Sequence, residues 1–142
     1  MKRILIVFFC IAMIVVLASC SKYNNVKITK GELPQKIEYV DELYGNVDCE
    51  ITDVSYETGF SNVEVIATVK MDKNEIDSSH SYNFPLLKCF LKNSQNIILT
   101  SNIQRIENIN EGDSINVKFS FNDLVDNESY TPAFKLISHL EQ

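Results

Sequence analysis

Residues able to do acid–base, nucleophilic or metal chemistry are sparse in this chain of 142 residues. Its two histidines, His80 and His139, stand in a polar loop and near the C-terminus, and neither has a spacing typical of a zinc site. The four glycines are isolated, so there is no glycine-rich phosphate loop, and no Gly-x-Ser-x-Gly turn presents a nucleophilic serine. The sequence therefore predicts no catalytic residue and no cofactor.

Two short stretches concentrate oxygen ligands of the kind that hard cations prefer. One set is Asp72, Asn74 and Asp77, and the other is Asp123, Asp126 and Glu128. Neither set has the glycine or the ligand order of an EF-hand loop. We interpret both as solvated acidic turns and expect no bound metal.

The four cysteines fall into two groups. Cys10 and Cys20 lie in the N-terminal segment, and Cys49 and Cys89 lie in the body of the chain. A disulfide between Cys49 and Cys89 would close a loop of about 40 residues and contribute on the order of 4 kcal/mol in the chain-entropy model. The alternative is two buried free thiols that pack as small hydrophobic side chains. The sequence leaves both alternatives open.

The N-terminus is organised like a secretory signal peptide. Lys2 and Arg3 precede an apolar run over residues 4–18, which is shorter than the roughly 18 or more residues that a spanning helix needs. The motif Leu17-Ala18-Ser19-Cys20 resembles the bacterial lipobox, in which an aliphatic and two small residues precede a cysteine that receives lipid.

The lipobox resemblance implies that residues 1–19 are a signal peptide and that Cys20 becomes the lipidated N-terminus. It implies a diacylglyceryl group and, in many bacteria, an N-acyl chain such as palmitate, which together provide stable anchoring. The protein would then lie on the extracytoplasmic side of a membrane, at the outer membrane or cell surface. The alternatives are an uncleaved anchor and a secretory signal that is cut elsewhere.

Composition limits the partners of the mature chain. Removal of residues 1–19 would leave 123 residues, the size of one domain, with a net charge of −8 rather than −6 because Lys2 and Arg3 leave with the signal. An acidic chain without a basic patch repels phosphate backbones, so we expect no nucleic-acid partner.

The segment after Cys20 is polar at first. We interpret residues 20–33 as the lipidated cysteine and a tether, with a short edge strand at residues 26–29. Residues 34–44 are ambiguous. Ile37 to Val40 suits a short strand, whereas Pro34 and Gly45 suit the start and end of a short helix that would have Ile37, Val40, Leu43 and Tyr44 on one face. We favour the helix.

From Val47 onward, apolar residues recur at every second position, which is the period of half-buried strands. This pattern predicts a strand at 47–56, with a bulge near Asp53 after which Val54 and Tyr56 continue the inward face. It predicts further strands at 63–71, 84–92, 97–100 and 115–121, and around Phe134 and Leu136. Residues 93–96 should form a hairpin turn, and Ile103, Ile106 and Ile109 should pack a connection under the sheet. Six or seven short strands favour an all-β antiparallel sandwich over residues 34–142.

The stretches NVEVIATVKM, FPLLKCFLKNSQNII and EGDSINVKFSF, within residues 47–139, resemble the immunoglobulin-like domains of small bacterial lipoproteins. That group includes the type built around a Phe-x-Leu-Tyr-Asp hairpin (FxLYD). The hairpin here reads Phe90-Leu91-Lys92-Asn93 and lacks the tyrosine, the aspartate and the following glycine. The resemblance implies an immunoglobulin-like sandwich.

Together these features favour a membrane-anchored envelope lipoprotein that is not an enzyme and serves as a binding or accessory module for an envelope protein. The alternatives are a binder of a small ligand or glycan and an inhibitor or self-protection protein that acts on an envelope enzyme. Four tyrosines near predicted turns could supply contact area or pack against the domain: Tyr44, Tyr56, Tyr82 and Tyr130.

Overall fold

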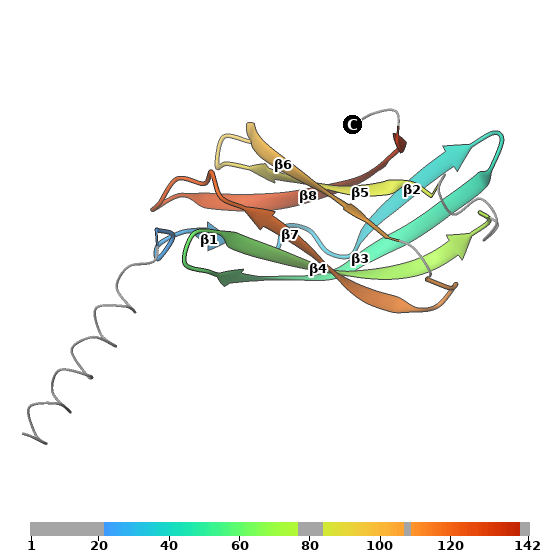
Figure 1. Ribbon diagram of the computed structural model, residues 1–142, viewed down its shortest axis with the longest axis horizontal. Helices are drawn as coiled ribbons and strands as arrows, with labels where there is room; N and C mark the ends of the chain where they lie inside the picture. Colours follow the sequence, from blue (N-terminus) through green and yellow to red (C-terminus); the bar gives the residue numbers. More distant parts are fainter. Residues whose placement is uncertain (1–21, 77–83, 107–108, 140–142) are drawn as a thin grey trace, which may run out of the picture.

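The computed structural model describes residues 22–76, 84–106 and 109–139, and these residues contain no α-helix. Two four-stranded sheets pack face to face (Figure 1), with strand orders β2-β3-β4-β7 and β1-β8-β5-β6. The all-β sandwich predicted from the sequence is confirmed. The described residues form eight strands rather than the six or seven expected.

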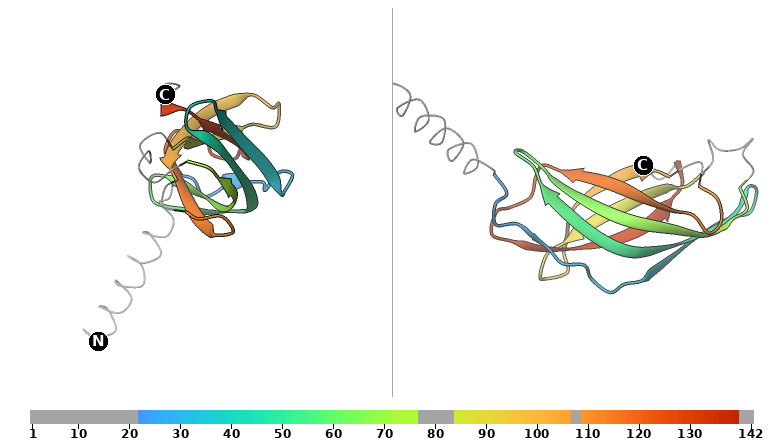
Figure 2. Two further views of the ribbon diagram at one scale, coloured as in Figure 1. Left: turned by 90° about the vertical axis from the view of Figure 1, so that its right-hand side faces the viewer. Right: turned by 90° about the horizontal axis from the view of Figure 1, so that it is seen from below.

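The first sheet contains β2 (Gln35–Asp41), β3 (Gly45–Thr58), β4 (Val63–Asn74) and β7 (Ser114–Phe121). The second contains β1 (Lys27–Ile28), β8 (Ser129–Ile137), β5 (Leu86–Lys92) and β6 (Ile98–Arg105). Neighbouring strands are antiparallel except β1 and β8, which are parallel. The right panel of Figure 2 shows β3 and β4 running along the length of the molecule.

The central strands are paired as in an immunoglobulin-like sandwich. β4 pairs with β7 in one sheet and β5 with β8 in the other, as strands B with E and C with F do in that fold. The free side of β8 is occupied by the N-terminal β1. The N-terminal segment therefore completes the second sheet.

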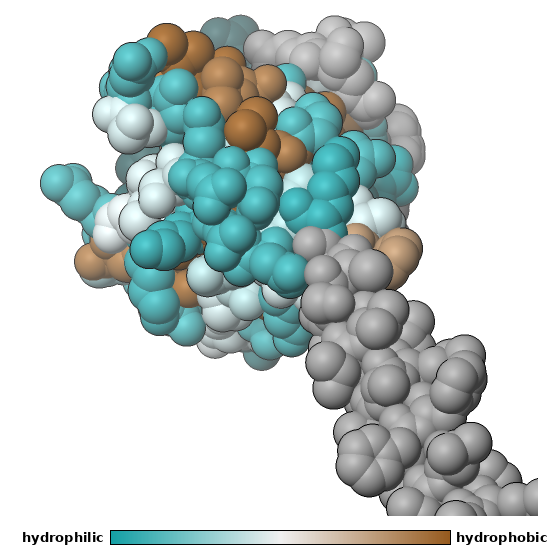
Figure 3. Space-filling view, turned by 90° about the vertical axis from the view of Figure 1, so that its left-hand side faces the viewer, coloured by the Kyte–Doolittle hydropathy of each residue, from teal (hydrophilic) through white to brown (hydrophobic). Residues whose placement is uncertain are grey.

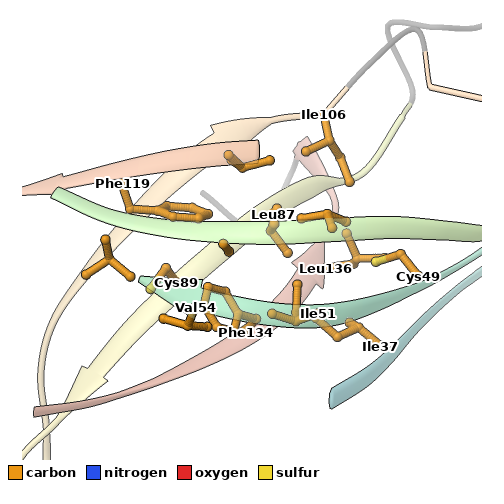
Figure 4. Close-up of a cluster of buried hydrophobic side chains, with 14 of the residues drawn as sticks. Ile37, Cys49, Ile51, Val54, Leu87, Cys89, Ile106, Phe119, Phe134 and Leu136 are labelled. Carbon is orange, nitrogen blue, oxygen red and sulfur yellow. The ribbon is translucent and has the colours of Figure 1, made fainter. Parts of the chain in front are cut away.

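Strict alternation in β4 explains how the sheets make a core. Five inward positions of β4 are fully buried: Val63, Val65, Ala67, Val69 and Met71. They face apolar residues of the second sheet, and Phe119 and Phe134 bring their ring centroids to 5.9 Å from opposite sheets. Figure 4 shows these phenylalanines in the cluster of buried side chains between the layers.

The predicted bulge in β3 is confirmed. The register with β4 shifts between Ile51 and Asp53, and again between Asp48 and Cys49. The extra residue lets Val54 stay buried after Ile51, although three positions rather than two separate them. Tyr56 was expected to continue this inward face, but it is 38% exposed near the end of the strand.

The helix favoured for residues 34–44 is wrong. Residues 35–41 form β2, which pairs with β3 from Gln35↔Ile51 to Asp41↔Gly45. Ile37 is buried against the core, while Val40 and Leu43 are exposed. These three residues therefore do not form one buried face, as they would on an amphipathic helix. The Asp41 carboxylate accepts hydrogen bonds from the backbone N–H groups of Leu43 and Tyr44 and thereby forms the turn.

The tether expected at residues 20–33 is not free from Lys22 onward. Tyr23 is fully buried, and Val26 and Ile28 are nearly so. β1 forms where expected, and the N–H of Thr29 donates to the carbonyl of Tyr130 at 2.8 Å. The segment packs because the backbone of β1 pairs with the free edge of β8 and these apolar side chains join the buried core. Burying an aliphatic side chain contributes about 1.5–3 kcal/mol.

The β5–β6 hairpin is confirmed, but its second strand is longer than expected. Ile103 lies within β6 rather than in a connection. Ile106 and Ile109 are buried, as expected, in the segment that leads toward β7.

Candidate functional site

The lipobox residues Leu17, Ala18, Ser19 and Cys20 lie outside the described residues, and the description begins at Lys22. Within the described ranges, no helix is long and apolar enough to cross a membrane. Membrane attachment through the N-terminus therefore stays a prediction from the sequence.

The turn of residues 22–25 is fastened to one end of the sandwich. The backbone N–H of Lys22 lies 3.5 Å from the carbonyl oxygen of Phe60, in the β3–β4 turn. The Tyr23 hydroxyl donates a hydrogen bond to the carbonyl of Asn122, in the β7–β8 loop, and Lys22 Nζ reaches the same carbonyl at 3.4 Å. Residues 22–25, 58–62 and 122–128 thus meet at what we call the N-terminal end.

Both cysteines of the domain are free and buried in the structure. Cys49 belongs to β3 and Cys89 to β5, so they sit in different sheets, and Figure 4 shows them at separate positions in the core. Burial raises the pKa of the Cys49 thiol to about 12, with Asp72 and Asp48 adding to the effect. Burial alone raises the pKa of Cys89. Thiols held protonated in this way are poor nucleophiles and poor metal ligands.

The described histidine has a structural partner. His139 Nε2 lies 3.0 Å from the carbonyl oxygen of Phe84, which links the C-terminal end of the chain to the start of β5. His80 lies outside the described residues, as does Tyr82.

The tyrosines near turns differ in their surroundings. Tyr44 is half-buried and Tyr130 is buried, and the backbone N–H of Val125 donates to the Tyr130 hydroxyl at 2.8 Å. Burial raises the pKa of this hydroxyl, and the nearby carboxylates of Glu128 and Asp123 add to the rise. Tyr130 is therefore a packing residue of the β7–β8 loop.

The first acidic set is engaged in local contacts. Asp72 forms an ion pair with Lys70, with 2.9 Å between Oδ1 and Nζ. The Asn74 side chain accepts from the N–H of Ile76 at 3.1 Å and donates to a carbonyl of the β6–β7 connection at 3.3 Å. Asp77 lies outside the described residues.

One residue of the second acidic set, Asp126, fastens two loops together. Asp126 accepts hydrogen bonds from the backbone and side-chain amides of Asn25, at 3.0 and 3.3 Å. In the part of the chain that the structure describes, no group of three or more His, Cys, Asp or Glu residues could hold a metal ion. The Asp126 carboxylate instead ties the 22–25 turn to the β7–β8 loop.

Exposed apolar residues stand out on the β5–β6 hairpin. Ile97, Ile98 and Leu99 are consecutive and are 51%, 54% and 46% exposed; we call them the β6 ridge. β6 is the outer strand of its sheet, and proteins normally protect such edges with charge, proline or a covering element. Figure 3 shows hydrophobic surface at the top of the molecule, where β6 lies in Figure 1. The sequence predicted a strand here but not its exposure.

Other exposed apolar side chains mark the two ends of the sandwich. Phe60 (71% exposed) and Val125 (55%) lie on loops of the N-terminal end. Val40 and Leu43 lie at the β2–β3 hairpin, which Figure 1 places at the opposite end of the long axis.

An open groove of about 900 Å³ lies between the start of β2 and the β5–β6 turn. Its lining is mostly polar and includes Glu32, Lys36, Lys92, Asn93 and Asn96. The size suits a small ligand, although such sites are usually lined mainly by apolar groups.

No protein-family model matches the chain, and neither a curated protein nor a solved structure is significantly similar to it.

Proposed function

We propose that the chain is a membrane-anchored envelope lipoprotein whose sandwich is a non-catalytic docking module for an envelope protein. In this proposal Cys20 carries the lipid on the extracytoplasmic side of the membrane, as the lipobox-like motif implies. The pairing of the central strands supports kinship with the immunoglobulin-like domains of small bacterial lipoproteins. The observation that carries the docking role is the β6 ridge.

The ridge has the properties of a surface that a partner covers. Three adjacent aliphatic side chains in water on an edge strand are an aggregation hazard unless they are functional. Fully burying an aliphatic side chain contributes about 1.5–3 kcal/mol, so covering three half-exposed ones offers on the order of 3 kcal/mol. An edge strand can also accept an added strand from a partner through main-chain hydrogen bonds.

The test is a crosslinking pull-down from native envelopes that compares four forms of the full chain. The wild type and Leu43→Thr, which removes one exposed aliphatic side chain at the opposite end, should recover one partner near stoichiometry. A double variant, Ile98→Thr with Leu99→Thr, should lose that partner, because threonine keeps β propensity but removes apolar area. Cys20→Ala should lose it too, because the module would leave the membrane.

Recovery of the same partner by the double ridge variant would refute the ridge as the docking surface. A wild-type chain that takes up no labelled acyl chain, while the cell's other lipoproteins do, would refute the lipid anchor. Circular dichroism of each variant checks that the sandwich is folded.

The groove favours a second candidate, a binder of a small polar ligand such as a glycan. Its amide, carboxylate and ammonium groups suit hydroxyl-rich ligands. A ligand of this site would raise the melting temperature in a saturable way, by mass action. Lys92→Ala should weaken that shift, and a glycan panel without any shift would count against the candidate.

A further inference from the structure

The N-terminal end of the sandwich lies very close to Cys20 along the chain. Tyr23 is fully buried, so its position is set by the domain. Three residues of fully extended chain span at most about 11 Å, which is therefore the greatest Cα separation of Cys20 from Tyr23. Whether the membrane attachment is a lipid on Cys20 or an uncleaved apolar segment at residues 4–18, the same end of the sandwich is held near the bilayer.

Three loops form the surface at this end, and two of them carry exposed apolar side chains. Phe60 is in the β3–β4 turn, and its backbone carbonyl faces the N–H of Lys22. Val125 is in the β7–β8 loop, which is fixed by the Tyr130 hydroxyl and by Asn25. Because the 22–25 turn bonds to both loops, Phe60 and Val125 are held in place relative to the point where the chain leaves toward Cys20.

We propose that the N-terminal end rests on the bilayer, with Phe60 and Val125 inserted into the lipid interface beside the N-terminal anchor. This inference depends on the proposed membrane attachment and adds the orientation of the domain. Apolar side chains on a polar surface enter the boundary between headgroups and acyl chains by about 5–10 Å. The bilayer is the surface that covers Phe60 and Val125, because the N-terminal attachment holds it within reach of these side chains.

The character of this contact follows from the charges around it. The β7–β8 loop carries three carboxylates, on Asp123, Asp126 and Glu128, whereas the N-terminal segment carries two lysines, Lys22 and Lys27. This balance does not attract anionic headgroups, so the contact is apolar and should persist at high salt. Figure 3, which looks at this side of the molecule, shows a mainly hydrophilic surface with separate hydrophobic areas.

The proposed contact makes the molecule stand on its N-terminal end. Figure 1 shows the long axis running from this end to the β2–β3 hairpin. Leu43, which is 84% exposed at that hairpin, would then point away from the bilayer. It therefore provides a matched control position.

The absence of tryptophan from the chain allows a direct test with single-tryptophan variants of the full lipidated protein: Phe60→Trp, Val125→Trp and Leu43→Trp. Each is reconstituted into vesicles of phosphatidylethanolamine and phosphatidylglycerol, with or without brominated phosphatidylcholine. At interfacial depth the emission of Phe60→Trp and Val125→Trp should fall by about half in brominated vesicles. The emission of Leu43→Trp should not change, and 1 M salt should leave the pattern the same.

Vesicle flotation separates the ways in which the idea can fail. If the variants float with the vesicles but Phe60→Trp and Val125→Trp are not quenched, the orientation is refuted and the anchor stands. Quenching of Leu43→Trp, or of only one of the two loop positions, also refutes the two-loop contact. If the protein does not float, the proposed anchor fails, and the orientation fails with it.

Discussion

Tyr23 provides the sharpest test of whether the N-terminal segment belongs to the domain. The sequence pattern treats this residue as part of a polar tether, whereas the structure buries its ring completely and lets its hydroxyl donate to the Asn122 carbonyl. Replacing Tyr23 by alanine removes both interactions. Replacing it by phenylalanine removes only the hydrogen bond.

The expected losses follow from these contacts. Truncating a fully buried aromatic side chain to alanine costs about 3–5 kcal/mol of unfolding free energy, and one neutral hydrogen bond contributes about 0.5–1.5 kcal/mol. The Asn122 carbonyl keeps Lys22 Nζ nearby at 3.4 Å, so Tyr23→Phe should lose about 1 kcal/mol or less. Tyr23→Ala should lose about 3–5 kcal/mol, a large part of the 5–15 kcal/mol typical of a domain.

The assay is urea unfolding of residues 21–142, followed by far-ultraviolet circular dichroism. The matched control is Tyr56→Ala, which removes the same side chain from a partly exposed position on β3. The control should lose about 1 kcal/mol or less. The melting temperature of Tyr23→Ala should fall by roughly 10–20 °C in a domain of this size.

A flexible tether predicts a different result. If residues 22–33 did not pack on β8, Tyr23→Ala would change the unfolding free energy by less than about 0.5 kcal/mol. A loss no larger than that of Tyr56→Ala would therefore refute the packed segment. It would also remove the basis for placing the N-terminal end against the bilayer.

Three further predictions concern the domain itself. Gly45 has a φ of +105°, and a Cβ at this position would lie 2.8 Å from the Cβ of Glu75. Gly112 has a φ of +85°, but a Cβ there would meet open space. Urea unfolding should therefore show a loss of unfolding free energy of about 1–2 kcal/mol for Gly112→Ala and a larger loss for Gly45→Ala. Cys49 and Cys89 are buried, and the pKa of Cys49 is about 12. Both thiols should therefore react with Ellman's reagent at pH 8 only when urea unfolds the chain. Rapid labelling of the folded protein would contradict their burial. Hydrogen bonding to Lys73 lowers the pKa of Glu75 in the folded state, so Glu75→Gln should destabilise the fold at pH 7. The difference in unfolding free energy should begin to shrink near the ordinary glutamate pKa and be lost as the pH falls through the lowered pKa of the folded state, and a series of urea unfolding curves from pH 7 downward checks this.

The body of the sandwich could be predicted because its strands each have one buried face. The alternation in residues 63–71 is local information, and the structure buries all five of the inward residues that it predicts. The phase slip after Ile51 likewise showed the bulge near Asp53, since one inserted residue moves every later side chain to the other face. The hairpin through residues 93–96 followed from its turn residues.

The parts that sequence reasoning missed depend on distant residues. Ile37, Val40 and Leu43 have helical spacing, but pairing of residues 35–41 with β3 decides the conformation. The burial of Tyr23 depends on a loop about a hundred positions away in the chain. The exposure of the β6 ridge depends on where its strand falls in the order of the second sheet. A local pattern contains none of this information.

The packed N-terminal segment changes how a small docking surface could work. A flexible tether of thirteen residues has a root-mean-square span of about 20 Å, and a domain on such a tether loses much orientational freedom when it docks. In the proposed arrangement the 22–25 turn fixes the sandwich close to the bilayer before any partner arrives. Less freedom is then lost on docking, because a partner in the same membrane meets the β6 ridge within a narrow range of heights and orientations. Three aliphatic side chains can then contribute enough binding free energy for a partner that shares the membrane, although they would be a weak site in solution.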